Sequence, residues 1–204
     1  MPAWVRPLAP RCGLAPLWPD MMDRRRALLL APFGVAAVAG VGGYTVLSRM
    51  KSGTFDPKGV PSQLIGRPVP DFDLPAQEPG RGFSSADLRA TGRPLLLNFY
   101  ASWCVPCVIE HPELMALARG GLPIWGIAYK DTAAAAYGFL ARHGNPFSRI
   151  ARDAPGQVAI DFGVYGVPES YLLDRTGLVQ WRYAGPLTPQ VVAEQLRPLL
   201  QRFA

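Results

Sequence analysis

The stretch LLLNFYASWCVPC, residues 95–107, decides the fold of this 204-residue chain. Its first part, residues 95–100, is a nearly continuous apolar run, typical of a central strand that is covered on both faces. The residues after it have the pattern of a helix, so Cys104 and Cys107 stand where the strand passes into that helix. Two cysteines separated by two residues can form a disulfide only where the backbone turns tightly, which the first turn of a helix allows.

This position favours thiol–disulfide chemistry. Free backbone N–H groups and the positive end of the helix dipole favour a thiolate at Cys104, whose pKa should lie below the free value of about 8.5. The thiolate attacks a partner disulfide, and Cys107 can then attack the mixed disulfide and release the partner. Pro106 suits a first helical turn, where its missing N–H breaks no helix bond. We therefore predict a redox-active disulfide, Cys104–Cys107, and no bound cofactor.

The rest of the folded part alternates between strand and helix patterns. Strands that alternate with helices predict parallel pairing through crossovers, whereas the last two strands are joined by a short turn and must be antiparallel. We predict an α/β, thioredoxin-like fold with a central mixed sheet, mostly parallel, and helices on both faces. The predicted strands are 69–74, 95–100, 123–129, 169–173 and 179–183. The predicted helices are 108–119, 132–143 and 187–203, and another helix begins within 83–88; the apolar positions of the helix 108–119 include Ile109 and Leu114. Residues 147–160 show a less regular pattern.

The N-terminal part contains a stretch that is long and apolar enough to span a membrane. Residues 27–47, ALLLAPFGVAAVAGVGGYTVL, carry no charge. At about 1.5 Å per residue, a helix of this length reaches roughly 30 Å, the thickness of the hydrocarbon core. Pro32 and the glycines are tolerated in such a helix. We predict an uncleaved transmembrane anchor; the alternative is a signal peptide that is cleaved after Ala39.

The charges beside this stretch predict its orientation. The arginines at 24–26 outweigh Arg49 and Lys51, which predicts that the N-terminus stays in the cytoplasm and that the rest of the chain is exported. The predicted parts are a disordered leader (1–26), the anchor (27–47), a linker (48–66) and a thioredoxin-like domain (67–204). Translation can begin at Met1, or at Met21 or Met22, immediately before the arginines.

Composition argues against several other classes. The formal net charge of +6 arises largely before residue 60, and no basic stretch of the folded part is interleaved with aromatic residues, so we expect no nucleic-acid partner. A secreted disulfide scaffold would contain more than the three cysteines present. One working pair and a stray Cys12 in the leader fit the composition better.

Several motifs together resemble one family. Residues 103–107, WCVPC, resemble the thioredoxin active site, and residues 163–170, GVYGVPES, resemble the proline loop of the membrane-tethered thioredoxin-like proteins of cytochrome c maturation, the CcmG/DsbE group. The segments GIAYKD (126–131), GNP (144–146) and YAG (183–185) also match that group. The resemblance covers roughly residues 60 to 200.

The resemblance implies roles for several residues. Pro168 is expected to be a cis-proline beside the dithiol, and Glu110 and Glu169 are expected to be acidic residues that act there. A carboxylate near Cys104 would disfavour the thiolate, but it could take the proton from Cys107. For Glu110, the alternative is a solvated position on the helix surface.

The resemblance also predicts the surroundings of the dithiol. Trp103 is expected to cover it at the surface and to contact the partner. Tyr165 and Val167 are expected to line a groove for the partner, although Tyr165 could instead be a packed side chain. Asn98 stands six residues before the first cysteine, where thioredoxin has a buried acid, whereas the CcmG/DsbE group tends to have a neutral residue. The identity of the general base therefore stays open.

The function that the resemblance implies is reduction of the haem-binding cysteine pair of apocytochrome c, or of another cytochrome c maturation protein. The resemblance also implies that the catalytic domain lies in the periplasm, held at the inner membrane, where a membrane thiol electron donor would recharge the protein. A general exported thiol reductase and a disulfide-forming oxidant are alternatives, because the reduction potential, roughly −270 to −120 mV among such proteins, sets the direction. A more remote alternative is a metal-binding module in which Cys104, Cys107 and His111 converge, but we expect no metal site.

Overall fold

The structure is a computed structural model that describes residues 29, 32, 34–45, 48, 62–75 and 82–203. The chain divides into two units, Met1–Pro57 and Lys58–Ala204, and each is described by itself. In the first unit, residues 34–45 are helical. Among the described residues, no helix has both the length and the apolar character that crossing a membrane requires. The predicted leader lies outside the described residues, as do parts of the predicted anchor and linker.

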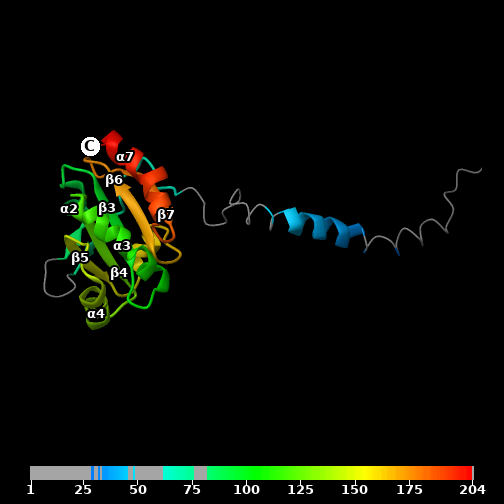
Figure 1. Ribbon diagram of the computed structural model, residues 1–204, viewed down its shortest axis with the longest axis horizontal. Coiled ribbons are helices and arrows are strands. Elements are labelled where there is room, and N and C mark those ends of the chain that lie inside the picture. The colour runs from blue at the N-terminus through cyan, green and yellow to red at the C-terminus, as the bar shows by residue number, and fades with distance from the viewer. Residues whose placement is uncertain are drawn as a thin grey trace, which may run out of the picture. The chain divides into compact units, whose positions relative to one another are not determined.

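The second unit is built on a five-stranded sheet with the order β5-β4-β3-β6-β7 (Figure 1). The central strand β3 (Leu95–Tyr100) pairs in parallel with β4 (Ile124–Tyr129) and antiparallel with β6 (Glu169–Leu173). β4 pairs in parallel with β5 (Arg149–Asp153), and β6 pairs antiparallel with β7 (Val179–Ala184). All residues of β3 are buried, as the apolar run predicts. The predicted mixed sheet is confirmed, but it is not mostly parallel: two of its four strand pairings are parallel and two are antiparallel, because β6 runs opposite to β3.

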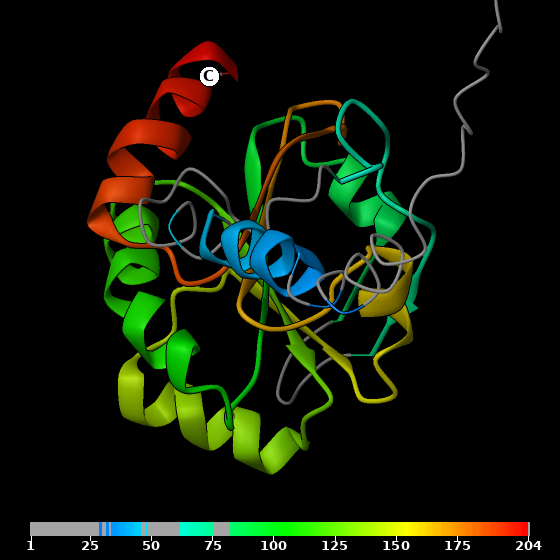
Figure 2. The same cartoon turned by 90° about the vertical axis from the view of Figure 1, so that its right-hand side faces the viewer.

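Helices cover both faces of this sheet, which lies between them in Figure 2. One face packs against α3 (Val105–Arg119), α4 (Ala133–His143) and the C-terminal helix. The other face packs against α2 (Ser85–Arg89), α5 (Gln157–Asp161) and the segments before them. The C-terminal helix consists of α6 (Pro189–Val191), a π-helical segment (Val192–Leu196) and α7 (Arg197–Phe203). This is the thioredoxin-like arrangement that the sequence predicts.

Local signals place the ends of these helices. The hydroxyl of Thr132 accepts a hydrogen bond from the N–H of Ala135 at the start of α4, and Thr188 caps the C-terminal helix in the same way. α3 begins at Val105, three residues earlier than the predicted helix, so Cys104 is its N-cap. Both cysteines therefore lie at the first turn, as their spacing predicts.

The prediction for residues 147–160 is incomplete, because this segment contains β5 and α5. β5 carries two arginines, which hide its alternating pattern. The guanidinium of Arg149 lies over the ring of Trp125, 4.5 Å from the ring centroid, and 5.9 Å from that of Phe83. A long basic side chain can cover apolar surface in this way, so a charge in the sequence does not mark a solvated position here.

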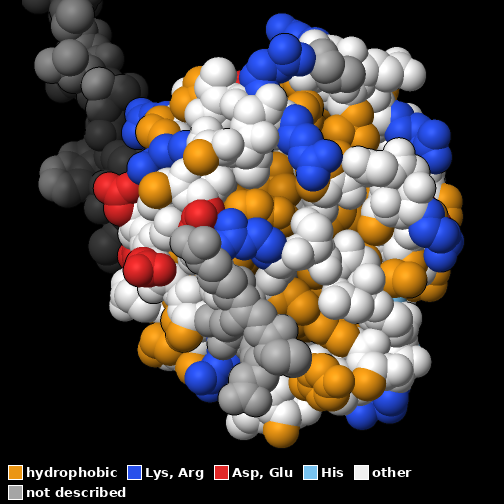
Figure 3. All heavy atoms as spheres, turned by 90° about the vertical axis from the view of Figure 1, so that its left-hand side faces the viewer, with side chains coloured by type: hydrophobic (Ala, Val, Ile, Leu, Met, Phe, Trp, Pro, Cys, Tyr) orange, Lys and Arg blue, Asp and Glu red, His pale blue; other side chains and the backbone are white. Residues whose placement is uncertain are grey.

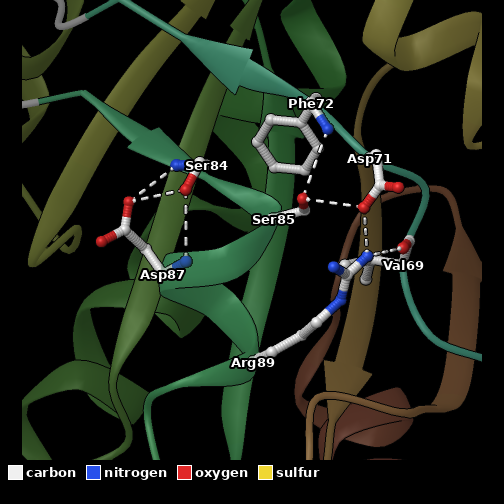
Figure 4. A network of polar contacts seen from close by, with 7 residues as sticks. All are labelled: Val69, Asp71, Phe72, Ser84, Ser85, Asp87 and Arg89. Carbon is white, nitrogen blue, oxygen red and sulfur yellow. Dashed lines mark hydrogen bonds and ion pairs between the residues drawn. The ribbon is translucent and has the colours of Figure 1, made fainter.

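The predicted strand 69–74 is also shorter than expected. Only β1 (Asp73–Leu74) is a strand, and it pairs with β2 (Phe83–Ser84). The backbone before β1 forms hydrogen bonds with side chains instead of with a strand. For example, the guanidinium of Arg89 donates a hydrogen bond to the carbonyl of Val69 (Figure 4). Side chains of α2 thus take the place of a neighbouring strand. The same network includes Asp71, Phe72, Ser84, Ser85 and Asp87.

The surface of the second unit mixes charged and apolar side chains. On the face that Figure 3 shows, Lys and Arg lie scattered, mainly near the edge, and apolar side chains are exposed between them. Asp and Glu lie toward one side of the same face. The basic side chains on this face do not form one continuous patch.

We predict that Gly126→Ala destabilises the protein. Gly126 lies within β4, and a Cβ atom there would stand 2.9 Å from Cγ of Phe147. Because the ring would have to move within a packed core, the free energy of unfolding should fall by about 1–3 kcal/mol, measured by urea denaturation. The control is Gly138→Ala within α4, where a Cβ atom meets only the flexible end of Arg142. It should be neutral or stabilising by up to about 1 kcal/mol, and equal destabilisation of both variants would contradict the prediction.

Candidate active site

The two cysteines lie where β3 passes into α3. Cys104 and Cys107 form a disulfide, with their Cα atoms 5.3 Å apart. The sulfur of Cys104 accepts a hydrogen bond from the backbone N–H of Cys107, with an N–S distance of 3.1 Å. Both cysteines are buried. After reduction, the helix dipole and this N–H group would favour a thiolate at Cys104.

A groove of about 230 Å³ opens beside the dithiol. Pro106, between the two cysteines, lines it on one side, and residues 165–168 and 184–186 line the rest. The Val167–Pro168 peptide bond is cis, as the resemblance implies. Tyr165 is 57% exposed, so it is a groove residue rather than a packed one. The structure thus brings Tyr165, Val167 and Pro168 together in one wall.

The connection between β4 and α4 holds the two residues before Cys104. The carboxylate of Asp131 accepts hydrogen bonds from the N–H of Ser102 at 2.6 Å and from its hydroxyl at 3.0 Å. The indole N–H of Trp103 donates to the carbonyl of Lys130 at 3.2 Å, and the side chain stays exposed. In the sequence, Asp131 stands out only as the last residue of the GIAYKD segment that matches the CcmG/DsbE group. Its contact with Ser102 joins two segments that the sequence alone does not place together.

A buried polar network lies one turn along α3 from Cys107. Glu110 is fully buried, and its Oε1 accepts a hydrogen bond from Nδ2 of Asn98 at 2.9 Å. Its Oε2 accepts from the N–H of Leu187 at 3.0 Å. Nδ2 of Asn98 also donates to the hydroxyl of Ser170 at 3.1 Å. The alternative of a solvated Glu110 is therefore wrong.

Burial changes the acidity of this carboxyl group. It raises the pKa of Glu110 to about 7, against the hydrogen bonds from Leu187 and Asn98, which lower it. Glu110 can therefore gain and lose a proton near neutral pH, the range in which a general base works well. Asn98 cannot exchange protons, so in this network the titratable group is Glu110. Among the predicted site residues, it is the one whose surroundings suit a proton acceptor.

The second predicted carboxylate, Glu169, points to the other face of the sheet. Side chains alternate along a strand, so Glu169 lies with Tyr171, whereas Ser170 lies with Asn98 and Glu110. Glu169 is buried, accepts a hydrogen bond from the hydroxyl of Tyr171 and pairs with Nε of Arg182 at 2.5 Å. The structure therefore does not bring Glu110 and Glu169 together, although Glu169 directly follows the cis-proline.

Arg182, on β7, holds the loop that carries Pro168. Besides Glu169 at the end of this loop, it contacts the ring of Tyr165, with Cζ 5.2 Å from the ring centroid. It also lies 3.5 Å from the carbonyl oxygen of Gly163 at the start of the loop. Sequence reasoning missed Arg182, because only the register of β6 and β7 brings it beside Glu169.

The described residues give no support to the metal-binding alternative. In the described ranges of the chain, no three His, Cys, Asp or Glu side chains gather in a way that could hold a metal ion. Nε2 of His111 lies 2.9 Å from the carbonyl oxygen of Gly144, and the ring packs edge-on against Phe139. Burial lowers the pKa of His111, so the ring is neutral at pH 7 and donates to this carbonyl group.

The fold, the Cys104–Cys107 disulfide at a helix N-terminus and the cis-Pro168 loop define a thioredoxin-like thiol–disulfide oxidoreductase. Comparison with known proteins agrees, since the Redoxin family matches residues 64–196. The thiol:disulfide interchange protein DsbE of Pseudomonas aeruginosa is 42% identical over 180 residues, which cover 88% of this chain and 96% of that protein. DsbE of Escherichia coli K12 is 36% identical over 180 residues, which cover 88% of this chain and 97% of that protein.

Two further relatives support the same class. The thiol:disulfide interchange protein HelX of Rhodobacter capsulatus is 42% identical over 145 residues, covering 71% of this chain and 82% of that protein. The structure of a thiol-disulfide oxidoreductase from Bacteroides fragilis superposes with a TM-score of 0.55 and 26% identity, covering 66% of this chain and 100% of that chain. The chain belongs to the redoxin family and, within it, to the thioredoxin-like DsbE/CcmG proteins, as its motifs predict.

We predict that the proton of Glu110 makes stability depend on pH. The pKa is about 7 in the folded protein and 4.5 in its ordinary state, so between these values the folded state binds more protons than the unfolded state. Stability therefore falls as the pH rises through this window, by on the order of 3 kcal/mol. Glu110→Gln can keep the hydrogen bond from Leu187 but cannot titrate, so urea unfolding from about pH 5 to pH 8 should no longer show this fall.

The control is Glu113→Gln, which removes a partly exposed carboxylate from the same helix. It should leave the fall in stability unchanged. If Glu110→Gln retains the full pH dependence, the carboxyl group of Glu110 is not its source.

Proposed function

We propose that this protein is a membrane-anchored periplasmic reductant that keeps the haem-binding cysteine pair of apocytochrome c reduced. The observation that carries the proposal is the Cys104–Cys107 dithiol at the start of α3, beside the cis-Pro168 loop. The sequence of this loop resembles that of the CcmG/DsbE group, and the similarity to DsbE proteins extends over 88% of the chain. The alternative direct partner of the same chemistry is another cytochrome c maturation protein.

The reaction is a two-electron exchange between dithiol and disulfide. The thiolate of Cys104 attacks one sulfur of the partner disulfide, and the other partner sulfur leaves as a thiolate that takes up a proton. Cys107 then loses its proton and attacks the sulfur of Cys104, which releases the second partner sulfur. The partner ends as a dithiol, and the protein ends with the Cys104–Cys107 disulfide.

We propose that the carboxylate of Glu110 accepts the proton that the thiol of Cys107 loses. Both residues are buried and lie one turn apart on α3. A carboxyl group with a pKa of about 7 is partly ionised at neutral pH, so it can accept this proton when Cys107 becomes the nucleophile. Glu169 has a different part in this proposal: through Arg182 it positions the loop of Pro168, as its contacts support.

The proposal includes recharging at the membrane. A membrane thiol electron donor would reduce the Cys104–Cys107 disulfide after each cycle. The apolar segment 27–47 is proposed as the inner-membrane anchor and residues 67–204 as the catalytic domain in the periplasm. The absence of charge in this segment and the arginines at 24–26 support this arrangement. Cleavage after Ala39 is the alternative, and it would release the domain.

Trapping tests the substrate. With Cys107→Ser, the mixed disulfide cannot be resolved, so an adduct between Cys104 and apocytochrome c should accumulate. We expect it as a band on a non-reducing gel that disappears on reduction, with the joined cysteines identified by mass spectrometry. Cys104→Ser is the matched control, which lacks the attacking thiol and should form no adduct.

If Cys107→Ser traps other disulfide proteins but not apocytochrome c, the substrate assignment is wrong. The oxidoreductase activity would stand, and a general exported reductase or an oxidant would become the better description.

A further inference from the structure

A second hollow lies next to the dithiol groove. It has a volume of about 420 Å³ and is lined by residues 62–64, by residues 160–163 at the end of α5, and by Tyr165 and Arg182. Tyr165 also lines the dithiol groove. The two spaces therefore meet at Tyr165.

Exposed apolar side chains mark the rim of this hollow. Ile160 is 61% exposed and Tyr165 is 57% exposed. Phe162, which is buried, and Leu64, which packs against the core, add apolar surface within it. Exposed apolar side chains that gather beside a hollow, rather than lie scattered singly, are typical of a binding surface. Elsewhere in the described part of the second unit, the large exposed apolar side chains are Ile65, Trp103, Val105, Val108, Ile109 and Tyr137.

The chemistry at Cys104 indicates what would enter this space. Because Cys104 is buried, a partner sulfur can reach it only if the partner polypeptide lies closely against the dithiol groove. The partner residues that adjoin the attacked cysteine must then leave this groove, and an extended chain advances about 3.3 Å per residue. Because Tyr165 lines both spaces, a chain that leaves the groove past this side chain comes to the second hollow.

Arg182 keeps the boundary between the two spaces in place. It contacts the Tyr165 ring and is itself fixed by its ion pair with the buried Glu169. The Tyr165 side chain is thus exposed to a partner, and its contact with Arg182 restricts its movement. A preformed surface of this kind costs less conformational entropy on binding than a mobile one.

We propose that the flank site, formed by Leu64, Ile160, Phe162 and Tyr165, binds a large apolar side chain of the partner polypeptide, close in sequence to the attacked cysteine. The site adds recognition of the neighbouring sequence to recognition of the disulfide. This proposal rests on the exchange reaction at Cys104 with a polypeptide, and not on that polypeptide being apocytochrome c.

The test uses the reduced full chain and three synthetic disulfide peptides. One contains only an oxidised Cys-Xaa-Xaa-Cys-His segment, and the other two add phenylalanine residues before or after it. Rates measured in single turnover at increasing peptide concentration give the half-saturating concentration and the limiting rate. At least one extended peptide should half-saturate the protein at an about tenfold lower concentration, because burial of one large apolar side chain can supply this factor.

The variant Ile160→Glu should remove this advantage and leave the unextended peptide unchanged. Since Ile160 is exposed, the substitution should not disturb the core. The control Tyr137→Glu, at a 57% exposed position on α4, should leave all three peptides unchanged.

Three results would overturn the proposal. The first is that neither extended peptide half-saturates at a lower concentration than the unextended one. The second is that Ile160→Glu affects all peptides equally. The third is that Ile160→Glu changes the oligomeric state, which would make the hollow an interface between copies of this chain. If the peptide results hold but apocytochrome c forms no adduct with Cys107→Ser, the flank site stands and the proposed function fails.

Discussion

The hydrogen bond from the N–H of Cys107 to the sulfur of Cys104 is the interaction on which the site depends. The first N–H groups of a helix have no partner within the helix, and here the attacking sulfur takes one of them. This requires β3 to end at Tyr100 and α3 to begin at Val105, so the short connection between them must hold one conformation. Asp131 provides much of this support through its two hydrogen bonds to Ser102.

The buried carboxyl group of Glu110 complements this arrangement. A fixed negative charge near the dithiol would oppose the thiolate of Cys104, but burial raises the pKa of Glu110 to about 7, so the group is neutral for part of the time. The same pKa lets it accept a proton when Cys107 must become a nucleophile. The hydrogen bonds from Asn98 and Leu187 hold this carboxyl group between β3 and the segment that precedes the C-terminal helix.

Much of the fold follows from local sequence signals. The apolar run of β3, the helix patterns at 132–143 and 187–203 and the short turn between β6 and β7 predict a mixed sheet with helices on both faces. β5 escaped prediction because Arg149 covers apolar rings although it carries a charge. Such stacking depends on the neighbouring strand, so it leaves no local pattern in the sequence.

The site is less predictable than the fold, because its polar groups depend on packing. The cysteines and cis-Pro168 are found from motif and resemblance, whereas the buried face of α3 is not. Ile109, expected among the apolar positions, is 61% exposed, whereas Glu110 and His111 beside it are buried. The face of the sheet to which the Glu169 side chain points follows from the alternation of side chains along β6. Its pairing with Arg182 depends on the register of β6 and β7, which the sequence does not give.

The reduction potential of the Cys104–Cys107 pair tests the central claim, that this dithiol works as a reductant. The full chain can be equilibrated with glutathione and dithiothreitol buffers, and the fraction of oxidised protein measured at each ratio. We predict a potential near or below about −200 mV, at which the dithiol donates electrons. A potential near −120 mV would show a disulfide donor and contradict the proposed reduction of haem-attachment cysteines.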